Sequence, residues 1–565
     1  MKHVIPARPW LPASVLALRD YSSRTLLSDL AAGVTVGLVA LPLAMAFAIS
    51  SGMTPQAGIY CAVVTGFLIS ALGGSRVQIG GPTGAFVVVV SGIIVQYGVD
   101  GLFMCTMMAG VLLVVMGLTG TGTAVRFIPR PVVIGFTNGI ALVIASTQIR
   151  DFLGMHLPPP IPSEFIPRMS RIAANMHLFS AESTALGAGC LLLIVAWGRA
   201  FPRVPGYIMA LVVGTLVALV GGLSVDTVGS RFGGIPSGLP ELHVPRFRPD
   251  LILTLLSPTL TIAVLGAIES LMSAVVADRM TGERHNSNVE LFAQGIANVV
   301  SPMFGGLPAT GAIARTATNI RSGGKTPVAG MVHALTLLCI LLFAAPWAAY
   351  IPMSVLAAIL LVVAWNMGEW HEIPELLRHS WTDRLVWGVT FGLTVLADLT
   401  VAVEAGMILA ALLFIRRVSA TTTVSRVTDE YVEGGRAHIL QDKPIPDYVT
   451  IYRIHGPFLF GSTDKLQALV DEVPHMPPVV VLRLRNMTAI DATGLQAIED
   501  FADRLEASGR TLLLCGALSQ PAALMDQVEF HRHVGERNIL PNVQAALDRA
   551  GEVMATRSQS LPAAG

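Results

Sequence analysis

The sequence predicts a polytopic α-helical membrane protein that carries a small α/β domain at its C-terminal end. Of its 565 residues, 53% are hydrophobic and 13% are charged, and the mean hydropathy of +0.64 is too apolar for a soluble protein of this length. One short stretch interrupted by glycine and proline occurs in near-copy in two places of the apolar part. Beyond about residue 437, short apolar runs alternate with amphipathic segments, which is typical of a sheet covered by helices.

The two near-copies indicate an internal repeat. They read Ile79-Gly-Gly-Pro-Thr-Gly-Ala-Phe86 and Phe304-Gly-Gly-Leu-Pro-Ala-Thr-Gly-Ala-Ile313. A long apolar segment opens 53 residues before the threonine of the first copy and 57 residues before that of the second. Kinks in two ordinary helices are the alternative interpretation. Paired interrupted segments in the two halves of a membrane chain favour the binding site of a transporter.

Seven apolar segments precede a polar loop and seven follow it. The first seven lie near residues 30–51, 56–73, 83–97, 101–119, 131–149, 183–201 and 205–223, and the second seven near 252–277, 288–304, 310–321, 328–346, 350–367, 384–398 and 401–415. The segments 83–97 and 310–321 are short for a bilayer, which needs about 20 helical residues, so each is predicted to join an extended stretch to a half-helix. Because each half has an odd number of spans, the second repeat is predicted to be inverted.

The predicted domain organisation has four parts. They are a cytoplasmic N-terminus over residues 1–28, a membrane domain over 29–417 with repeats at 29–224 and 252–417, an α/β domain over 437–550 and a disordered tail over 551–565. A cytoplasmic N-terminus places most basic loop residues on the inner side, as the positive-inside rule requires. We therefore expect a multi-pass protein of the inner (plasma) membrane with both termini in the cytoplasm.

The starts of the two half-helices are the predicted substrate site, because a helix N-terminus offers free N–H groups and partial positive charge to an anion. The residues of this site are Thr83, Gly84, Ala85, Phe86, Thr310, Gly311, Ala312 and Arg315. Arg315 lies about one turn into the second half-helix, where a guanidinium group would hold an oxyanion bidentately. Its alternatives are to neutralise Glu269 or to extend toward the cytoplasm.

Glu269 is the only ionisable residue between Leu251 and Ala277. A charge at membrane depth is costly unless it faces a partner or a watery cavity. Because a carboxylate removed from water keeps its proton more readily, Glu269 is the predicted proton-coupling residue. Ser273 lies one turn further on the same face and is expected to assist it. The alternative is a structural glutamate bonded to helix backbone.

The C-terminal domain is predicted to contain strands near 448–453, 479–484 and 511–514 and helices near 463–473 and 494–507. Thr493 stands between a strand and a helix, so its hydroxyl group is a candidate regulatory phosphosite at a helix N-terminus. The alternative is a plain helix cap. The five cysteines are scattered and no catalytic or metal-binding spacing occurs, so no enzyme activity, cofactor, metal site or nucleic-acid partner is expected.

Several stretches together resemble the sulfate permease (SulP/SLC26) family. They are Ala32 to Phe47, Gly74 to Phe86, Gly323 to Thr326 and, in the C-terminal domain, Asp491 to Gly494. The resemblance implies a seven-plus-seven inverted repeat divided into core and gate bundles, followed by a cytoplasmic STAS domain. It also implies anion transport, a homodimer and a possible cytoplasmic protein partner of the STAS domain. In related antagonist proteins a serine usually stands where this chain has Ala492, a departure that weakens the phosphosite hypothesis.

The function expected from this resemblance is secondary active transport of an inorganic anion, sulfate foremost, coupled to protons. The stretches Gly266 to Leu271 and Leu361 to Met367 resemble a bacterial branch that includes a C4-dicarboxylate transporter, so dicarboxylate and bicarbonate stay open as substrates. An anion channel of the same fold and a membrane-tethered regulator are further alternatives. The family's sodium-coupled bicarbonate carriers have Asp and Thr at the positions of Glu269 and Ser273, so Glu269 favours protons over sodium.

Overall fold

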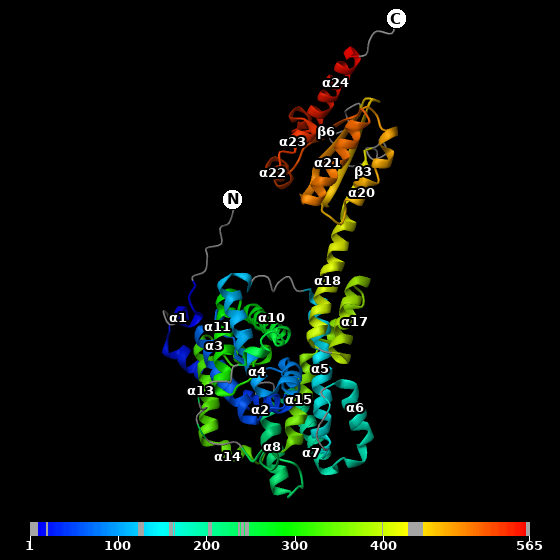
Figure 1. Ribbon diagram of the computed structural model, residues 1–565. Helices are drawn as coiled ribbons and strands as arrows, with labels where there is room; N and C mark the ends of the chain where they lie inside the picture. The colour runs from blue at the N-terminus through cyan, green and yellow to red at the C-terminus, as the bar shows by residue number, and fades with distance from the viewer. Residues whose placement is uncertain are drawn as a thin grey trace. The chain divides into compact units, whose positions relative to one another are not determined.

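The computed structural model describes residues 10–17, 21–122, 129–157, 162, 164–201, 206–234, 238, 242, 248–397, 399–427 and 445–560 (Figure 1). The chain divides into two units, Met1–Ile408 and Leu409–Gly565. The long helix α18 (Leu399–Thr421) contains the boundary between them. The predicted end of the membrane domain at residue 417 also falls inside this helix.

All fourteen predicted apolar segments contain helix. In the first half the elements are α1 (Ala13–Ala17), α2 (Ser23–Ser50), α3 (Pro55–Leu72), β1 (Gly80–Gly81), α4 (Phe86–Leu118), α5 (Arg130–Phe152), α6 (Phe165–Ala174), α7 (Ala181–Ala200), α8 (Gly206–Val220) and α9 (Val228–Phe232). In the second half they are α10 (Leu256–Thr281), α11 (Ser287–Val300), β2 (Thr310–Gly311), α12 (Ile313–Arg321), α13 (Pro327–Phe343), α14 (Ala345–Ala348), α15 (Met353–Met367), α16 (Ile373–Leu376), α17 (Trp381–Leu396) and α18. By length and composition, seven helices in the described residues are able to cross a membrane.

Helix α4 contains two of the predicted segments, joined at a break. Gly98 has φ 72° and ψ −177° inside this helix, a conformation that glycine adopts without the strain a side chain would cause. The break divides α4 into a first part after β1 and a second part that runs to Leu118. The first part is therefore the half-helix that the sequence predicts.

The two halves pack against each other in an exchanged pattern. Helices α2 and α3 contact α13, and correspondingly α10 and α11 contact α4. Helix α5 packs against α17 and α15, and α15 packs against α7. The contacts of one half map onto those of the other when α2 is exchanged with α10, α3 with α11, α4 with α13, α5 with α15 and α7 with α17, and the contact between α5 and α15 maps onto itself. An inverted repeat produces this pattern.

The strands β1 and β2 bring the two glycine-rich copies together. They pair antiparallel, with Gly80 opposite Gly311 and Gly81 opposite Thr310. The backbones cross closely, since a Cβ atom on Gly311 would stand 1.8 Å from Nε2 of Gln78 and would force that side chain to move. Helix α4 begins at Phe86 and α12 at Ile313, directly after these strands. The predicted extended stretch followed by a half-helix is confirmed in both copies.

Two buried carboxylates connect the two halves of the membrane unit. Each accepts hydrogen bonds from backbone N–H groups of a loop in the other half. Asp29 on α2 accepts hydrogen bonds from the backbone N–H groups of Lys325 (2.7 Å) and Thr326 (3.2 Å), just before α13. Glu290 on α11 accepts from the N–H groups of Gly74 (2.9 Å) and Ser75 (3.1 Å), just after α3. Hydrogen bonds of this kind satisfy an otherwise costly buried charge.

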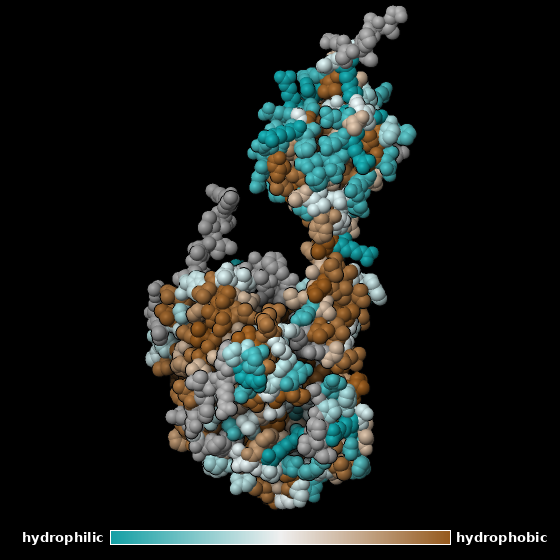
Figure 2. Space-filling model, viewed as in Figure 1, coloured by the Kyte–Doolittle hydropathy of each residue, from teal (hydrophilic) through white to brown (hydrophobic). Residues whose placement is uncertain are grey.

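The C-terminal unit contains a five-stranded sheet in the order β3-β4-β5-β6-β7. Its elements are β3 (Thr423–Arg426), β4 (Val449–Phe458), α20 (Asp464–Gln467), β5 (Val479–Ile490), α21 (Ala492–Ala507), β6 (Thr511–Cys515), α22 (Ser519–Gln527), α23 (His531–Val534), β7 (Ile539–Leu540) and α24 (Val543–Ser560). Alternate residues of β5 enter two buried clusters, one with Phe501 of α21 and one with Ala546 of α24. The surface of this unit is mainly hydrophilic, whereas broad hydrophobic areas cover the membrane unit (Figure 2).

Three predicted boundaries differ from the structure. Helix α2 begins at Ser23, before residue 29. Strand β3 belongs to the C-terminal sheet although it precedes residue 437, because its pairing with β4 decides its conformation more than its own polar sequence does. Helix α24 runs to Ser560, so the prediction of disorder is wrong for residues 551–560, where Val553 and Met554 pack against the sheet. Residues 561–565 lie outside the described residues.

Candidate functional site

A central cavity of about 380 Å³ lies between two groups of helices. The core bundle comprises α2, α3, α4 and α10–α13, and the gate bundle comprises α5, α7, α8, α15, α17 and α18. The core supplies Val39, Leu43, Phe47, Thr83, Gly84, Ile268, Glu269, Met272, Gly311, Ala312, Ile313, Ala314, Arg315 and Thr318, and the gate region supplies Val133, Phe136, Thr137, Tyr207, Val363, Asn366, Met367 and Glu369. Five predicted substrate residues and Glu269 therefore face one cavity.

Glu269 is half-buried on α10 and accepts a hydrogen bond from the hydroxyl group of Thr83, with 2.8 Å between Oγ1 and Oε2. This bond joins α10 to the residue that precedes the first half-helix. The alternative of a glutamate bonded to helix backbone does not fit, because its bond is to a side chain at the cavity. No ion pair within 4.0 Å joins Glu269 to Arg315 in the described structure.

Arg315 lines the cavity although it is only 3% exposed. Its Nη2 atom donates a hydrogen bond to the carbonyl oxygen of Pro82, and its Nη1 atom has no hydrogen-bond partner among the described residues. Gly81 makes room for this guanidinium group, since a Cβ atom there would stand 2.5 Å from Nη1. The side chain therefore lies at the cavity, between the two half-helices. A buried cationic donor without a protein acceptor is suited to an anion.

The starts of both half-helices lack a side-chain hydrogen-bond acceptor. The N-cap residues are Ala85 for α4 and Ala312 for α12, and neither helix has a side-chain cap. Alanine has no side-chain oxygen to accept from the first N–H groups, which an ordinary serine or aspartate cap would satisfy. Gly84, Gly311 and Ala312 line the cavity at these ends.

Four predicted site residues do not line the cavity. The Thr310 hydroxyl group donates to the carbonyl oxygen of Gly266 (3.0 Å) and lies 2.6 Å from Oγ of Ser270. Ser273 is fully buried, with its Oγ atom 3.1 Å from Oγ1 of Thr316. Ala85 and Phe86 are buried in the apolar core. The one-turn spacing from Glu269 keeps Ser273 on a similar face but moves it along the axis to where α10 packs on α12, so a direct role at the cavity is not supported.

The gate bundle contributes polar residues that sequence reasoning missed. Asn366 near the end of α15 donates a hydrogen bond from Nδ2 to the hydroxyl oxygen of Tyr207 on α8, over 3.2 Å. Glu369 follows α15 and also lines the cavity. A polar residue in the apolar Met353–Met367 segment was a usable signal for Asn366. The sequence gives no comparable indication for Tyr207, because a tyrosine at the start of a helix is common.

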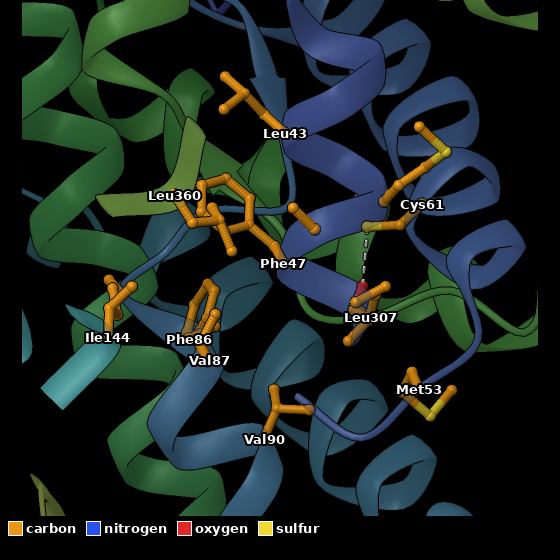
Figure 3. Packing of buried hydrophobic residues seen from close by; sticks show 14 of the residues in the cluster. Leu43, Phe47, Met53, Cys61, Phe86, Val87, Val90, Ile144, Leu307 and Leu360 are labelled. Carbon is orange, nitrogen blue, oxygen red and sulfur yellow. Dashed lines mark hydrogen bonds between the residues drawn. The ribbon is translucent and has the colours of Figure 1, made fainter. Parts of the chain in front are cut away.

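Four apolar residues pack at one end of the central cavity and close it, and we call them the apolar seal. They are Phe47, Val87, Ile144 and Leu360. At Gly84 a Cβ atom would stand 3.0 Å from Cδ1 of Ile144 on α5 and 3.2 Å from Cε1 of Phe47 on α2. Phe47, Val87, Ile144 and Leu360 belong to one buried cluster and are drawn together in Figure 3. Toward the other end, the lining continues through Thr318, Asn366 and Glu369 near the ends of α12 and α15. The cavity thus extends toward the end of the bundle where α2 begins.

In the C-terminal unit, Thr493 is exposed in the first turn of α21. The cap of this helix is Asp491, whose Oδ1 atom accepts from the N–H group of Gly494 over 2.8 Å. The interpretation of Thr493 as a plain cap is therefore wrong, because an aspartate two residues earlier already fills that role. Its hydroxyl group stays available at a helix N-terminus.

Comparison with known proteins agrees with this architecture. Residues 26–390 match the sulfate permease family, and residues 441–546 match the STAS domain. The chain belongs to the sulfate permease family. This family consists of transporters, which supports the expectation that the protein is not an enzyme.

Two curated relatives of this sulfate permease family member cover almost the whole chain. YvdB of Bacillus subtilis (strain 168), which is named as a candidate sulfate transporter, is 40% identical over 522 residues, 92% of this chain and 97% of YvdB. The bicarbonate transporter BicA of Synechocystis is 31% identical over 93% of this chain and 94% of BicA.

Solved structures of family members share the fold. The structure of SLC26A9 superposes with a TM-score of 0.84 at 16% identity and covers 98% of this chain and 94% of SLC26A9. The transmembrane domain of a cyanobacterial BicA gives a TM-score of 0.60 at 34% identity over 69% of this chain and 98% of that domain. This family member is therefore a helical membrane transporter with a C-terminal STAS domain.

Proposed function

We propose that the protein is a proton-coupled secondary transporter of a small inorganic oxyanion, with sulfate as the foremost substrate. The observation that carries the proposal is a single cavity lined by the uncapped start of α12, by Gly84 just before α4, by Arg315 with its unused Nη1 donor and by Glu269. The likeness to YvdB supports sulfate. Bicarbonate is the second candidate, supported by the likeness to BicA.

The proposed anion site combines donors of different kinds. Backbone N–H groups at the starts of α4 and α12 supply partial positive charge, and Arg315 supplies a full charge. The rest of the lining is largely apolar, with Leu43, Phe136 and Val363 among its residues, so water is a weak competitor once the anion is bound. A C4-dicarboxylate would need a second cationic group at its far end, whereas the gate side presents Glu369.

Proton coupling is explained by competition for the Thr83 hydroxyl group, which donates either to Glu269 or to the substrate. An ionised Glu269 accepts the Thr83 hydrogen bond and repels an incoming anion across the cavity. Protonation of Glu269 removes the repulsion and weakens the hydrogen bond from Thr83, so the Thr83 hydroxyl group donates more readily to the substrate. Anion binding and protonation then favour each other, which is the thermodynamic condition for symport.

Alternating access would move the core bundle against the gate bundle while the two half-helix starts keep their positions. The apolar seal of Phe47, Val87, Ile144 and Leu360 closes one side and the polar mouth near Asn366 is the other. With both termini in the cytoplasm, the polar mouth faces inward and this is an inward-facing conformation. A seal on one side supports a carrier over a channel, in which both gates open together. We further propose residence in the inner membrane, a homodimer and a regulatory role for the STAS domain with Thr493 as its modification site.

Uptake by proteoliposomes tests this function. Labelled sulfate, bicarbonate and succinate are offered separately to the purified full-length protein, each with and without an acid-outside pH gradient. Saturable sulfate uptake that the gradient stimulates is the expected result. Stimulated bicarbonate uptake without sulfate uptake would transfer the assignment to bicarbonate, and uptake of none of the three would refute the proposal.

A further inference from the structure

A second cavity of about 230 Å³ lies beyond the apolar seal. Helices α2 and α5 line both cavities, one cavity after the other along each helix. On α2 the central cavity has Leu43 and Phe47, and the second has Ile49 to Gly52. On α5, Thr137 lines the first and Thr147, Arg150 and Asp151 line the second, with Ile144 of the seal between them. The second cavity therefore lies on the same core–gate boundary, on the closed side of the proposed substrate route.

The lining of the second cavity is basic. Arg150 on α5 and both Arg168 and Arg171 on α6 face it, and among the described lining residues Asp151 is the one carboxylate. Asp151 is already engaged by two guanidinium groups, with 2.7 Å to Arg150 and 2.7 Å to Arg231. Among the described residues that line this cavity, positive charge thus exceeds negative charge.

Arg168 is buried and held by hydrogen bonds, which distinguishes this cavity from an exposed basic surface. It is only 6% exposed and is held in place by donating from Nη1 to Oγ of Ser146 (3.0 Å) and from Nε to the carbonyl oxygen of Pro162 (3.1 Å). Hydroxyl groups of Ser50, Ser51, Ser91 and Thr147 complete the polar lining. Three of these hydroxyl groups donate to backbone carbonyl oxygens of their own helices, whereas that of Ser50 accepts from Gln148. A fixed, buried guanidinium group is suited to a small oxyanion.

We propose that the second cavity is an anion-binding antechamber, where the oxyanion substrate binds before the seal opens. This inference rests on the proposed function for the identity of its ligand. The polar bond above the seal, from Nε2 of Gln148 on α5 to Oγ of Ser50 on α2 over 2.9 Å, joins gate to core at the floor of this chamber. Because Ser50 accepts in this bond, its own hydroxyl proton stays available for donation to a bound anion.

A competing explanation is that these arginines only compensate the negative C-terminal ends of α2 and α5, which reach the same region. Under that explanation their loss lowers stability without changing substrate affinity from one side. The antechamber predicts a change in substrate affinity from one side of the membrane only, and charge compensation predicts none. Transport measured separately from each face of the membrane distinguishes them.

The test compares right-side-out and inside-out vesicles that contain the full-length protein, with sulfate as the probe. In Arg171→Gln, whose side chain is less buried than that of Arg168, we expect the apparent KM for sulfate from the second-cavity side to rise about tenfold, as the loss of one charge-assisted hydrogen bond predicts. From the central-cavity side the KM should not change, and Arg171→Lys should restore part of the loss.

Arg248→Gln is the matched control. Arg248 lies at the same end of the bundle, where its N–H group donates to Sδ of Met104 at 3.2 Å, but its exposed side chain pairs with Asp250 and does not line the cavity. An unchanged KM in Arg171→Gln, or equal changes from both sides, would overturn the antechamber. If wild-type vesicles transport none of the tested anions, the proposed function fails. In that case, sulfate binding to the purified protein tests whether the second cavity binds an anion. We expect about tenfold weaker binding in Arg171→Gln than in wild type, and equal binding would contradict the antechamber.

Discussion

Glu269 and Arg315 share one largely apolar cavity without forming an ion pair within 4.0 Å. Two opposite charges buried so close would ordinarily be paired directly, because an unpaired buried charge is costly. Here Glu269 is bonded to Thr83 and Arg315 to the carbonyl oxygen of Pro82. The carboxylate of Glu269 is therefore still able to take up a proton, and the guanidinium group of Arg315 is still able to donate a hydrogen bond from Nη1.

The carboxyl group of Glu269 is the proposed proton carrier. Glu269→Gln keeps the shape and the capacity to accept from Thr83 but cannot ionise, so we expect sulfate accumulation on a pH gradient to be lost while sulfate binding to the purified protein stays measurable. Glu283→Gln is the control, since Glu283 is an exposed carboxylate paired with Arg76. Accumulation by Glu269→Gln at the wild-type level would exclude this role.

Arg315 is the proposed charged contact to the anion. Its replacement in Arg315→Ala should weaken sulfate affinity by about 1.5–3 kcal/mol, the contribution of hydrogen bonds to charged groups. Isothermal titration of the purified variant measures this loss. Arg321→Ala removes an exposed arginine from the last turn of the same helix and should leave the affinity unchanged. Equal affinities in Arg315→Ala and wild type would make Arg315 a structural residue.

At the scale of elements, the half-helices were predictable because glycine, proline and apolar length are local signals. The pairing of β1 with β2 was not, since it joins residues from the two halves of the chain. Thr310 and Ser273 were assigned to the site from spacing along the chain, but their hydroxyl groups bond to α10 and α12 inside the core. Side-chain direction at a packed crossing depends on both helices, so one helix's periodicity does not determine it.

The crossing of α4 and α11 provides a test of packing in the core bundle. A Cβ atom on Gly110 would stand 2.7 Å from the carbonyl oxygen of Gly295 and 2.7 Å from the backbone nitrogen of Val299. Gly110→Ala should therefore destabilise the protein by about 1–3 kcal/mol, the usual cost of overpacking. Gly92 is the control on the same helix, because nothing lies within 4 Å of its added Cβ atom.

Thermal unfolding in detergent measures the difference between these variants. We expect a lower unfolding temperature for Gly110→Ala and no decrease for Gly92→Ala, where alanine also favours the helix. Equal unfolding temperatures would mean that α4 and α11 do not approach each other as closely as described.

At the scale of the whole molecule, composition alone separated an apolar membrane part from a polar α/β part, because membrane and water select different surfaces. The limits of the parts were less predictable. Strand β3 and the end of α24 owe their structure to partners elsewhere in the sheet, which a local reading of Thr423–Arg426 or of residues 551–560 does not include. The gate residues Tyr207 and Glu369 likewise gain their place in the cavity only from the packing of α8 and α15.

The C-terminal unit is predicted to be separable from the transport machinery, because both half-helices and the central cavity belong to the unit Met1–Ile408. Truncation after Arg417 should leave a membrane domain that folds and binds sulfate, with a lower transport rate or abundance. Sulfate binding and uptake per molecule of protein are the measurements. Loss of all binding, or wholly normal rate and abundance, would contradict a modular regulatory domain.

The most direct test of proton-coupled transport is the pH gradient at which net sulfate flux reverses in proteoliposomes of the full-length protein, with the membrane potential clamped at zero. If protons and sulfate cross together, flux down a fixed sulfate gradient should stop and then reverse as an opposing pH gradient is increased. The reversal point should move in proportion to the logarithm of the sulfate ratio. Flux that vanishes only at equal sulfate concentrations, whatever the pH gradient, would contradict the account and identify an uncoupled pathway.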